Sequence, residues 1–132
     1  MSRYAITRTL PVPFADAVER TRTALADQGF GVLTEIDVAA TMKAKLDVDV
    51  PQQLILGACN PPLAHRALQT EESIGVLLPC NVVVRADGPS STIVEAIDPS
   101  FLVAATANPG LESIAGEVSA KLLAALDALG QR

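Results

Sequence analysis

Both cysteines of the chain are followed directly by asparagine and lie beside proline. Cys59 and Asn60 belong to the stretch GACNPP, residues 57–62, and Cys80 and Asn81 belong to LPCN, residues 78–81. A thiol can act as a nucleophile, a redox centre or a ligand of a soft metal, and an amide can both donate and accept hydrogen bonds. The two Cys-Asn pairs are therefore the candidate site.

The first pair lies where a strand pattern gives way to a helix pattern. The apolar run at 53–59 predicts a strand, and PPLAHRALQTEE, residues 61–72, predicts a short helix. Asn60 is a favoured N-cap and Pro61 is favoured just inside a helix, so a purely structural role is open to both. Cys59 would then precede a helix N-terminus, where a thiol can become more reactive. The same N–H groups could instead bind a small anion.

The second pair lies inside the run IGVLLPCNVVVRA, residues 74–86, which has the strongest strand pattern of the chain. Pro79 cannot donate to a sheet ladder, so it predicts an edge position or a bulge. Cys80 has the parity of Val82, and Asn81 needs hydrogen-bond partners if it is buried, because an unsatisfied amide costs about 1–3 kcal/mol. The structural alternative is that Cys80 fills the core and Asn81 satisfies backbone groups left by Pro79.

The two pairs are expected to meet in one place. Residues 53–59, 61–72 and 74–84 have strand-helix-strand form, which predicts a right-handed crossover between parallel strands if the strands share a sheet. Each cysteine is the seventh residue of its strand, so both thiols should lie at a similar height, one or two strand spacings of about 4.8 Å apart. The candidate ligand-binding residues are Cys59, Asn60, Pro61, Pro79, Cys80 and Asn81.

Established catalytic and metal motifs do not match the chain. A structural zinc site takes four Cys or His ligands, and the chain has two cysteines and one histidine, so we predict no metal site within one chain. The two thiols lack the Cys-x-x-Cys spacing of redox motifs. The sequence also lacks the nucleophile elbow, the P-loop and the dinucleotide fingerprint. Catalytic residues and cofactors therefore stay unassigned.

The remaining patterns predict the scaffold. The predicted strands are 3–10, 30–38, 53–59, 74–86 and 92–98, and the predicted helices are 13–28, 39–46, 61–72 and 111–129. Turn residues at 87–91 join the last two strands into a hairpin. Residues 99–110 are apolar without a clear period, as in a partner-facing loop or a strand without an assigned place. The order β-α-β-(short α)-β-α-β-β-α predicts a single α+β domain, 1–132, with helices covering one face of a mixed or largely antiparallel sheet.

Composition excludes several classes of function. Hydrophobic residues make up 49 % and charged residues 19 %, which is the balance of a folded chain. A net charge of −5, only 3 % aromatic residues and the absence of Trp all argue against nucleic-acid binding. No apolar run approaches the ~20 residues that span a membrane, and MSRYAITRTL has no secretory h-region. We therefore expect a cytoplasmic protein, without membrane partners, whose thiols stay reduced.

The stretch ILGACNPPLAHRALQTEESIGVLLPCNVVV, residues 55–84, resembles the central signature of a bacterial and archaeal family known as domain of unknown function 302. The likeness extends to the opening strand and helix and to AIDP, residues 96–99. It implies a small α+β domain, related in outline to the TATA-binding-protein-like fold and often dimeric, with no established activity. The family motif positions, all without assigned roles, are Gly57, Cys59, Asn60, Pro61, Pro62, Leu78, Pro79, Cys80 and Asn81.

Three functions compete at this point. The first is a dimeric binding module that holds a small ligand, an anion or a soft metal at the two Cys-Asn pairs. The second is a structural or assembly protein with buried thiols, and the third is a thiol-dependent or redox enzyme that uses Cys59. Binding ranks first because no complete catalytic constellation is visible. A homodimer is expected from a second stripe on the last helix, formed by Gly116, Ala120, Leu123, Ala124 and Ala128.

Overall fold

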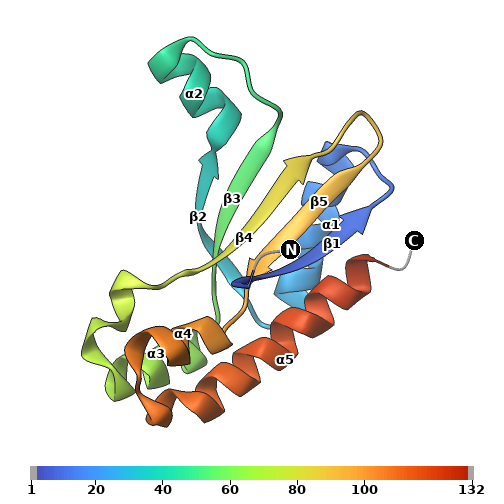
Figure 1. The fold of residues 1–132 in the computed structure, drawn as a ribbon. Helices are drawn as coiled ribbons and strands as arrows, with labels where there is room; N and C mark the ends of the chain where they lie inside the picture. Colours follow the sequence, from blue (N-terminus) through green and yellow to red (C-terminus); the bar gives the residue numbers. More distant parts are fainter. Residues whose placement is uncertain (1–2, 131–132) are drawn as a thin grey trace.

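Among residues 3–130, the part of the chain that the computed structural model describes, five strands form one antiparallel sheet (Figure 1). The strands are β1 (Ala5–Leu10), β2 (Gly31–Asp37), β3 (Gln53–Cys59), β4 (Cys80–Ala86) and β5 (Thr92–Ile97), in the spatial order β1-β5-β4-β3-β2. The predicted α+β class and the hairpin of β4 and β5 are confirmed. Residues 1–2 and 131–132, the two ends of the predicted 1–132 domain, lie outside the described residues.

Two long helices cover one face of this sheet. The helices are α1 (Phe14–Asp27), α2 (Val38–Leu46), α3 (Pro61–Thr70), α4 (Ser100–Thr106) and α5 (Glu112–Leu129), with short 3-10 turns η1 (Glu72–Val76) and η2 (Pro109–Leu111). Figure 1 shows α1 behind the sheet, with α5 running beside it. Gly29 follows the C-cap of α1 and has a φ of 83°, a backbone conformation that residues with a Cβ rarely adopt.

The main core lies between the sheet and these two helices. Alternate strand residues point into it, so Leu56, Val82 and Val94 are fully buried against Leu25 and Leu122. Burial of each such side chain contributes about 1.5–3 kcal/mol. The intervening strand residues point to the other side of the sheet, which we call the open face. Their side chains are mostly half-buried or exposed, because neither α1 nor α5 covers them.

The predicted parallel crossover is wrong. Strands β3 and β4 are antiparallel neighbours, with Leu56 opposite Val82 and Ala58 opposite Cys80. The predicted strand 74–86 is shorter than expected, because residues 72–76 form the 3-10 turn η1 and the strand begins only at Cys80. The chain therefore leaves the sheet at the end of β3, passes through α3 and η1, and returns to the same end of the sheet.

Two local predictions also change. Pro79 occupies neither an edge strand nor a bulge: it precedes β4, a central strand, so the sheet ladder begins with the next residue, which has an N–H group. The register shift in this sheet lies instead in β2, between Val32 and Thr34. The unassigned segment 99–110 forms α4 and η2 and is neither an extended loop nor a strand.

The start of α4 explains the AIDP stretch. Asp98 Oδ1 accepts hydrogen bonds from the backbone N of Ser100 at 3.0 Å and from its Oγ at 2.8 Å. Pro99 is fully buried beside it. Asp98 thus satisfies one backbone N–H group and one hydroxyl at the start of α4, which is a structural role. Among the helices of residues 3–130, none combines the length and the hydropathy that a membrane crossing requires.

Candidate functional site

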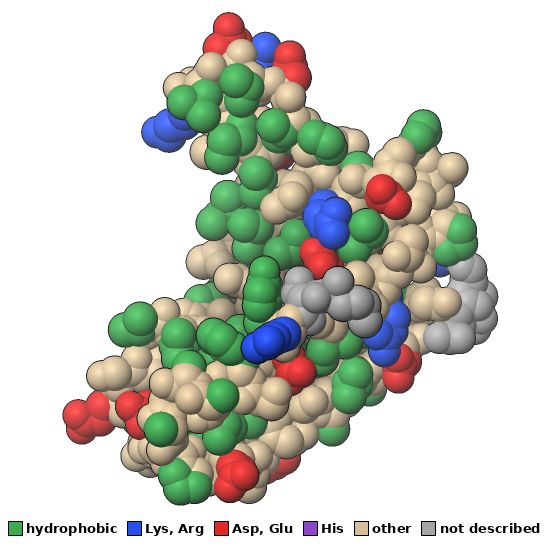
Figure 2. Space-filling model, viewed as in Figure 1, with side chains coloured by type: hydrophobic (Ala, Val, Ile, Leu, Met, Phe, Trp, Pro, Cys, Tyr) green, Lys and Arg blue, Asp and Glu red, His purple; other side chains and the backbone are tan. Residues whose placement is uncertain are grey.

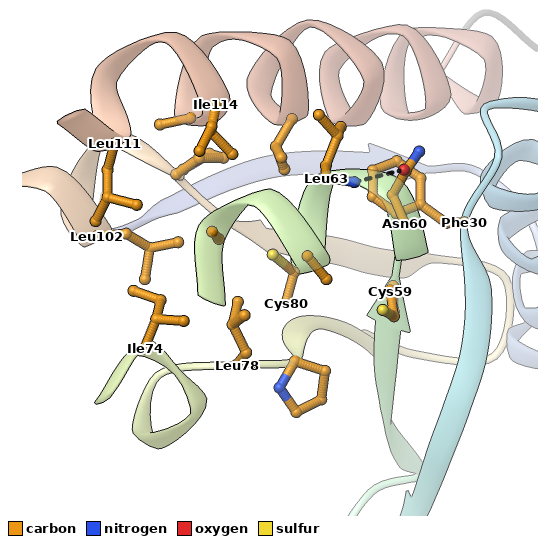
Figure 3. A pocket seen from close by; sticks show the side chains of 17 residues that line it. Phe30, Cys59, Asn60, Leu63, Ile74, Leu78, Cys80, Leu102, Leu111 and Ile114 are labelled. Atoms are coloured by element: carbon orange, nitrogen blue, oxygen red, sulfur yellow. Dashed lines mark hydrogen bonds between the residues drawn. The ribbon is translucent and has the colours of Figure 1, made fainter. Parts of the chain in front are cut away.

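A cavity of about 60 Å³ lies at the end of the sheet where β3 stops and β4 begins (Figure 3). Its walls come from the end of β3, from α3 and η1, from residues 78–80, from α4 and from the first turns of α5. Fourteen of the 17 lining residues are apolar, and the other three are Cys59, Asn60 and Cys80. The cavity is therefore an apolar space with two thiols and one amide at its wall.

The cavity lies at the junction of two hydrophobic clusters. Phe30 and Ala58 in its wall belong to the main core between sheet and helices. The other cluster consists of Leu63, Ala67, Ile74, Leu111 and Ile114. It is formed by α3, η1, η2 and α5, beyond the end of the sheet. Because the second cluster is built on the connection between β3 and β4, the space between the clusters is bordered by both Cys-Asn segments.

Cys80 is a buried, neutral group in the wall of this cavity. It is 7 % exposed and has the same orientation as Val82, toward the helices. Burial raises the pKa of its thiol from 9.0 to about 11, and the nearby Cys59 thiol contributes in the same direction. At neutral pH the sulfur is therefore protonated, which makes it a poor nucleophile and a poor metal ligand.

Cys59 is half-buried and borders the same cavity. The residue opposite Cys80 is Ala58, however, so the pleat directs the side chains of Cys59 and Cys80 to opposite faces of the sheet. The antiparallel register, and not a parallel crossover, brings residues 59 and 80 to the same end of the sheet. A disulfide between them would need Cβ atoms about 3.5–4.5 Å apart, which side chains on opposite faces do not provide.

Asn60 is the N-cap of α3, as predicted. Its Oδ1 accepts a hydrogen bond from the backbone N of Leu63 at 3.4 Å (Figure 3), and its carbonyl oxygen accepts one from Ala64 N at 2.9 Å. Pro61 and Pro62 open the helix and have no N–H group. The backbone N–H groups of residues 61–64 are thus either missing or already bonded, so this helix N-terminus has no donor to offer an anion.

Two of the six predicted site residues lie away from the cavity. Pro61 is exposed on α3 and does not line it. Asn81 is exposed on the open face, opposite Gly57, and does not line it either. Since Asn81 is exposed, it carries no cost of buried, unsatisfied hydrogen bonds. Cys59, Asn60, Pro79 and Cys80 do border the cavity.

Gly57 is required by a close approach at this end of the sheet. A Cβ added at this position would lie 2.1 Å from Thr34 Oγ1 and 2.8 Å from Pro79 Cγ. Both distances are far shorter than the ~3.5–4.0 Å of favourable contacts. The missing side chain therefore allows Thr34 and Pro79 to pack over β3, and Pro79 in turn forms part of the cavity wall.

Sequence reasoning missed most of the apolar wall. Ile74, Leu102, Leu111 and Ile114 all line the cavity, but none was predicted as a site residue. The sequence pattern predicts a strand at Ile74, and Leu102 lies in the segment without a clear period. The available signal was the apolar character of residues 99–111, which exceeds what an exposed loop needs.

Among residues 3–130, no group of three His, Cys, Asp or Glu side chains is placed to hold a metal ion.

Comparisons with known proteins agree on one family. The family described as Domain of unknown function DUF302 matches residues 6–129. The crystal structure of an uncharacterized conserved DUF302 protein from Bacillus stearothermophilus is similar to this chain, with a TM-score of 0.88 and 29 % sequence identity. The alignment covers 97 % of this chain and 99 % of that one. Comparison with curated proteins gives no significant match. With a match over nearly its whole length, the chain belongs to the DUF302 family.

Proposed function

We propose that the protein is a homodimeric binding module whose cavity takes a small, uncharged, apolar ligand. The observation that carries the proposal is the composition of the cavity wall, which is apolar except for one amide and two thiols. Apolar cavities exclude water and accept apolar guests, because a water molecule needs two to four polar partners that such a wall lacks. The ligand is therefore recognised by shape and hydrophobic contact.

The same wall argues against the two charged ligands suggested by the sequence. An anion would need free donors, and the first turn of α3 has its N–H groups missing or bonded to Asn60. A soft metal would need ionised thiols, and burial holds the pKa of Cys80 near 11. Transfer of an unpaired ion into such a space costs many kcal/mol. Neutral ligands avoid both penalties.

The size of the cavity limits the ligand. Its volume of about 60 Å³ is well below the ~300–1,000 Å³ of sites for drug-sized molecules. The fitting group is therefore a short hydrocarbon chain, alone or as the end of a longer molecule. Because a buried methylene contributes about 0.8 kcal/mol, each added CH₂ should tighten binding about fourfold until the cavity is full.

The test uses short primary alcohols as probes. Ethanol, 1-propanol and 1-butanol are titrated into the full chain, and methyl resonances of Leu63, Ile74 and Ile114 are followed by NMR. We expect saturable shifts at these methyls and a stepwise rise in affinity with chain length. Inorganic phosphate and Zn²⁺ are titrated in parallel. Shifts with either ion but not with the alcohols would overturn the proposal.

A matched pair of variants controls for non-specific effects. Ala64→Leu adds bulk at the cavity wall and should weaken 1-butanol binding at least tenfold. Ala105→Leu makes the same change at an exposed position of α4 outside the cavity and should leave binding unchanged. Equal binding by both variants would show that the probe binds elsewhere. Absence of binding to the wild type would favour the structural role with buried thiols.

A further inference from the structure

The connection between β3 and β4 covers the cavity beyond the end of the sheet. We call residues 61–78 the flap; they comprise α3, η1 and the residues that join these two elements to each other and to β4. Because Ala58 lies opposite Cys80, the chain leaves the sheet and returns to it at adjacent positions. Figure 1 shows the flap next to α4 and the first turns of α5. The flap is therefore joined to the sheet at one edge only.

Few side chains of the flap are buried. They are Leu63, Ala67 and Ile74, and all three line the cavity. They belong to the second hydrophobic cluster, whereas none of the 18 buried residues of the main core lies in the flap. Segments with few buried contacts open at a lower free energy than the whole protein unfolds. The flap can therefore separate from its neighbours while the main core stays intact.

The wall of the cavity is closed while the flap is in place. Of the 17 lining residues, 11 are buried, six are half-buried and none is exposed. Figure 2 shows that side chains fill the space between the flap and α4 on this face of the molecule. A hydrocarbon chain therefore has to displace part of the wall in order to enter.

The side chain of Asn108 ties the far end of α3 to the rest of the molecule. Its Nδ2 donates hydrogen bonds to Thr70 O at 3.1 Å and to Glu71 Oε1 at 2.8 Å. Its Oδ1 accepts a hydrogen bond from Gly110 N at 2.9 Å, which fixes the orientation of the amide on η2. Both bonds to the flap are made at the C-terminal end of α3, and they must break before α3 can move away from α4 and η2.

A second link between the flap and its neighbours is weaker. Arg66 Nη1 lies 2.9 Å from Glu117 Oε2 and joins α3 to α5. The two side chains are 45 % and 49 % exposed, and exposed ion pairs contribute little because water and salt screen them. Asn108 is half-buried, and its bond to the Glu71 carboxylate is charge-assisted, which makes such bonds stronger than neutral ones.

We propose that the flap is the gate of the cavity and that Asn108 is the latch that holds it closed. Opening separates α3 and η1 from α4, η2 and α5, and it breaks both bonds between Asn108 and the flap. The inference rests on the proposed function for the ligand itself, and it adds the route by which the ligand enters. A ligand in the cavity contacts Leu63 and Ile74 of the flap and Ile114 of α5 together, so it favours the closed state.

Alkylation of Cys80 measures the opening of the gate without any ligand. This side chain is 7 % exposed and lines the cavity, so we expect iodoacetamide to reach it only after the flap opens. Cys59→Ala removes the other thiol and is the background for every variant. When closing is faster than the reaction, the labelling rate is proportional to the population of the open state.

Asn108→Asp is the substitution that tests the latch. It keeps the Oδ1 acceptor for Gly110 N but removes the donor to Thr70 and Glu71. The labelling rate of Cys80 should rise about tenfold, because the two bonds that hold the flap are lost. Val94→Ala is the control, because it weakens the main core and leaves the flap unchanged. It should lower the urea midpoint without changing the labelling rate.

Hydrogen exchange locates the movement. Backbone amides of α3 should exchange faster in Asn108→Asp than in the wild type, and those of α1 should not change. Equal labelling rates in the wild type and Asn108→Asp would overturn the inference. So would labelling of Val94→Ala as fast as that of Asn108→Asp, because Cys80 would then react only through global unfolding.

The ligand is tested in a separate arm of the same experiment. Saturating 1-butanol should slow the labelling of Cys80 in the Cys59→Ala background, because a filled cavity favours the closed flap. If Asn108→Asp accelerates labelling and 1-butanol has no effect, the gate stands and the proposed ligand is wrong. Failure of the gate and failure of the ligand site therefore give different results.

Discussion

Substitution of Gly57 by alanine should destabilise the protein at the point where β2, β3 and Pro79 meet. The new Cβ would lie 2.1 Å from Thr34 Oγ1 and 2.8 Å from Pro79 Cγ. The proline ring is rigid and the Thr34 side chain is stiff at χ1, so relief requires the strands to shift. Overpacking of this kind costs about 1–3 kcal/mol, and the lower entropy of the unfolded alanine chain offsets about 0.4–1 kcal/mol. The expected net loss is about 1–2 kcal/mol.

Urea unfolding followed by far-UV circular dichroism measures this loss. The chain has no Trp, so intrinsic fluorescence offers little signal. The protein concentration must be held constant, because dimerisation would make the apparent stability depend on it. Gly75→Ala is the matched control: no atom lies within 4 Å of its added Cβ, so its free energy of unfolding should change by less than about 0.5 kcal/mol.

A double-mutant cycle identifies the cause of the loss. Thr34→Ala removes the hydroxyl that lies closest to the added Cβ, so the Gly57→Ala/Thr34→Ala protein should recover about 0.5–1 kcal/mol relative to the sum of the single changes. If Gly57→Ala were as stable as the wild type, the close approach would not be a constraint on the sequence. If it were unstable but uncoupled from Thr34, the strain would lie at Pro79 alone.

Two further substitutions test the wall of the cavity. Above pH 9 the unfolded Cys80 thiol ionises at its ordinary pKa while the buried one keeps its proton until about pH 11, so the wild type should lose stability between these values. By pH 11 the free energy of unfolding of the wild type should have fallen by about 2 kcal/mol more than that of Cys80→Ala, as measured by urea unfolding. An equal fall in both proteins would contradict this prediction. Asn60→Ala removes the cap on Leu63 N and should cost about 0.5–1 kcal/mol, at the lower end because the bond is 3.4 Å long. Asn60→Asp keeps the acceptor and should unfold near the wild-type urea midpoint, and equal stability of the alanine variant would show that the cap contributes nothing.

Local signals predicted the elements whose boundaries depend on neighbouring residues. The proline before α1 and Gly29 after it set the limits of that helix, and the 3.6-residue period set the buried side of α5. Asn60 was predicted as a cap because the two prolines after it favour a helix start. In each case the physical cause lies within a few residues, so the sequence alone contains it.

The direction of β4 could not be predicted in the same way. An apolar run such as IGVLL satisfies the pattern of a buried strand and of a packed 3-10 turn equally well. Ile74 packs with Leu63 and Leu111, so the choice is made by residues far along the chain. A strand over the whole run predicts a parallel crossover, whereas the 3-10 turn at Glu72–Val76 lets β4 return antiparallel to β3.

The cavity wall was hidden for the same reason. Leu102 and Ile114 border it from α4 and α5, whereas the two Cys-Asn pairs lie some 20 to 55 residues earlier. Cys59 and Cys80 have side chains that can do chemistry, and the sequence prediction is based on them. Aliphatic residues, however, supply most of the surface that a ligand would touch. Asn81 is next to Cys80 in the sequence, but the strand pleat directs its side chain to the open face.

The position of β1 at the edge of the sheet has a consequence for synthesis of the chain. Among the described strands, β1 forms its ladder with β5 alone, where Ala5 lies opposite Ile97 and Leu10 opposite Thr92. Because β1 is synthesised long before β5, it lacks its ladder partner while the residues between the two strands are made. Contacts so distant in sequence slow folding and leave a bare strand open to aggregation. During this interval β1 is a suitable target for a chaperone that binds short extended segments.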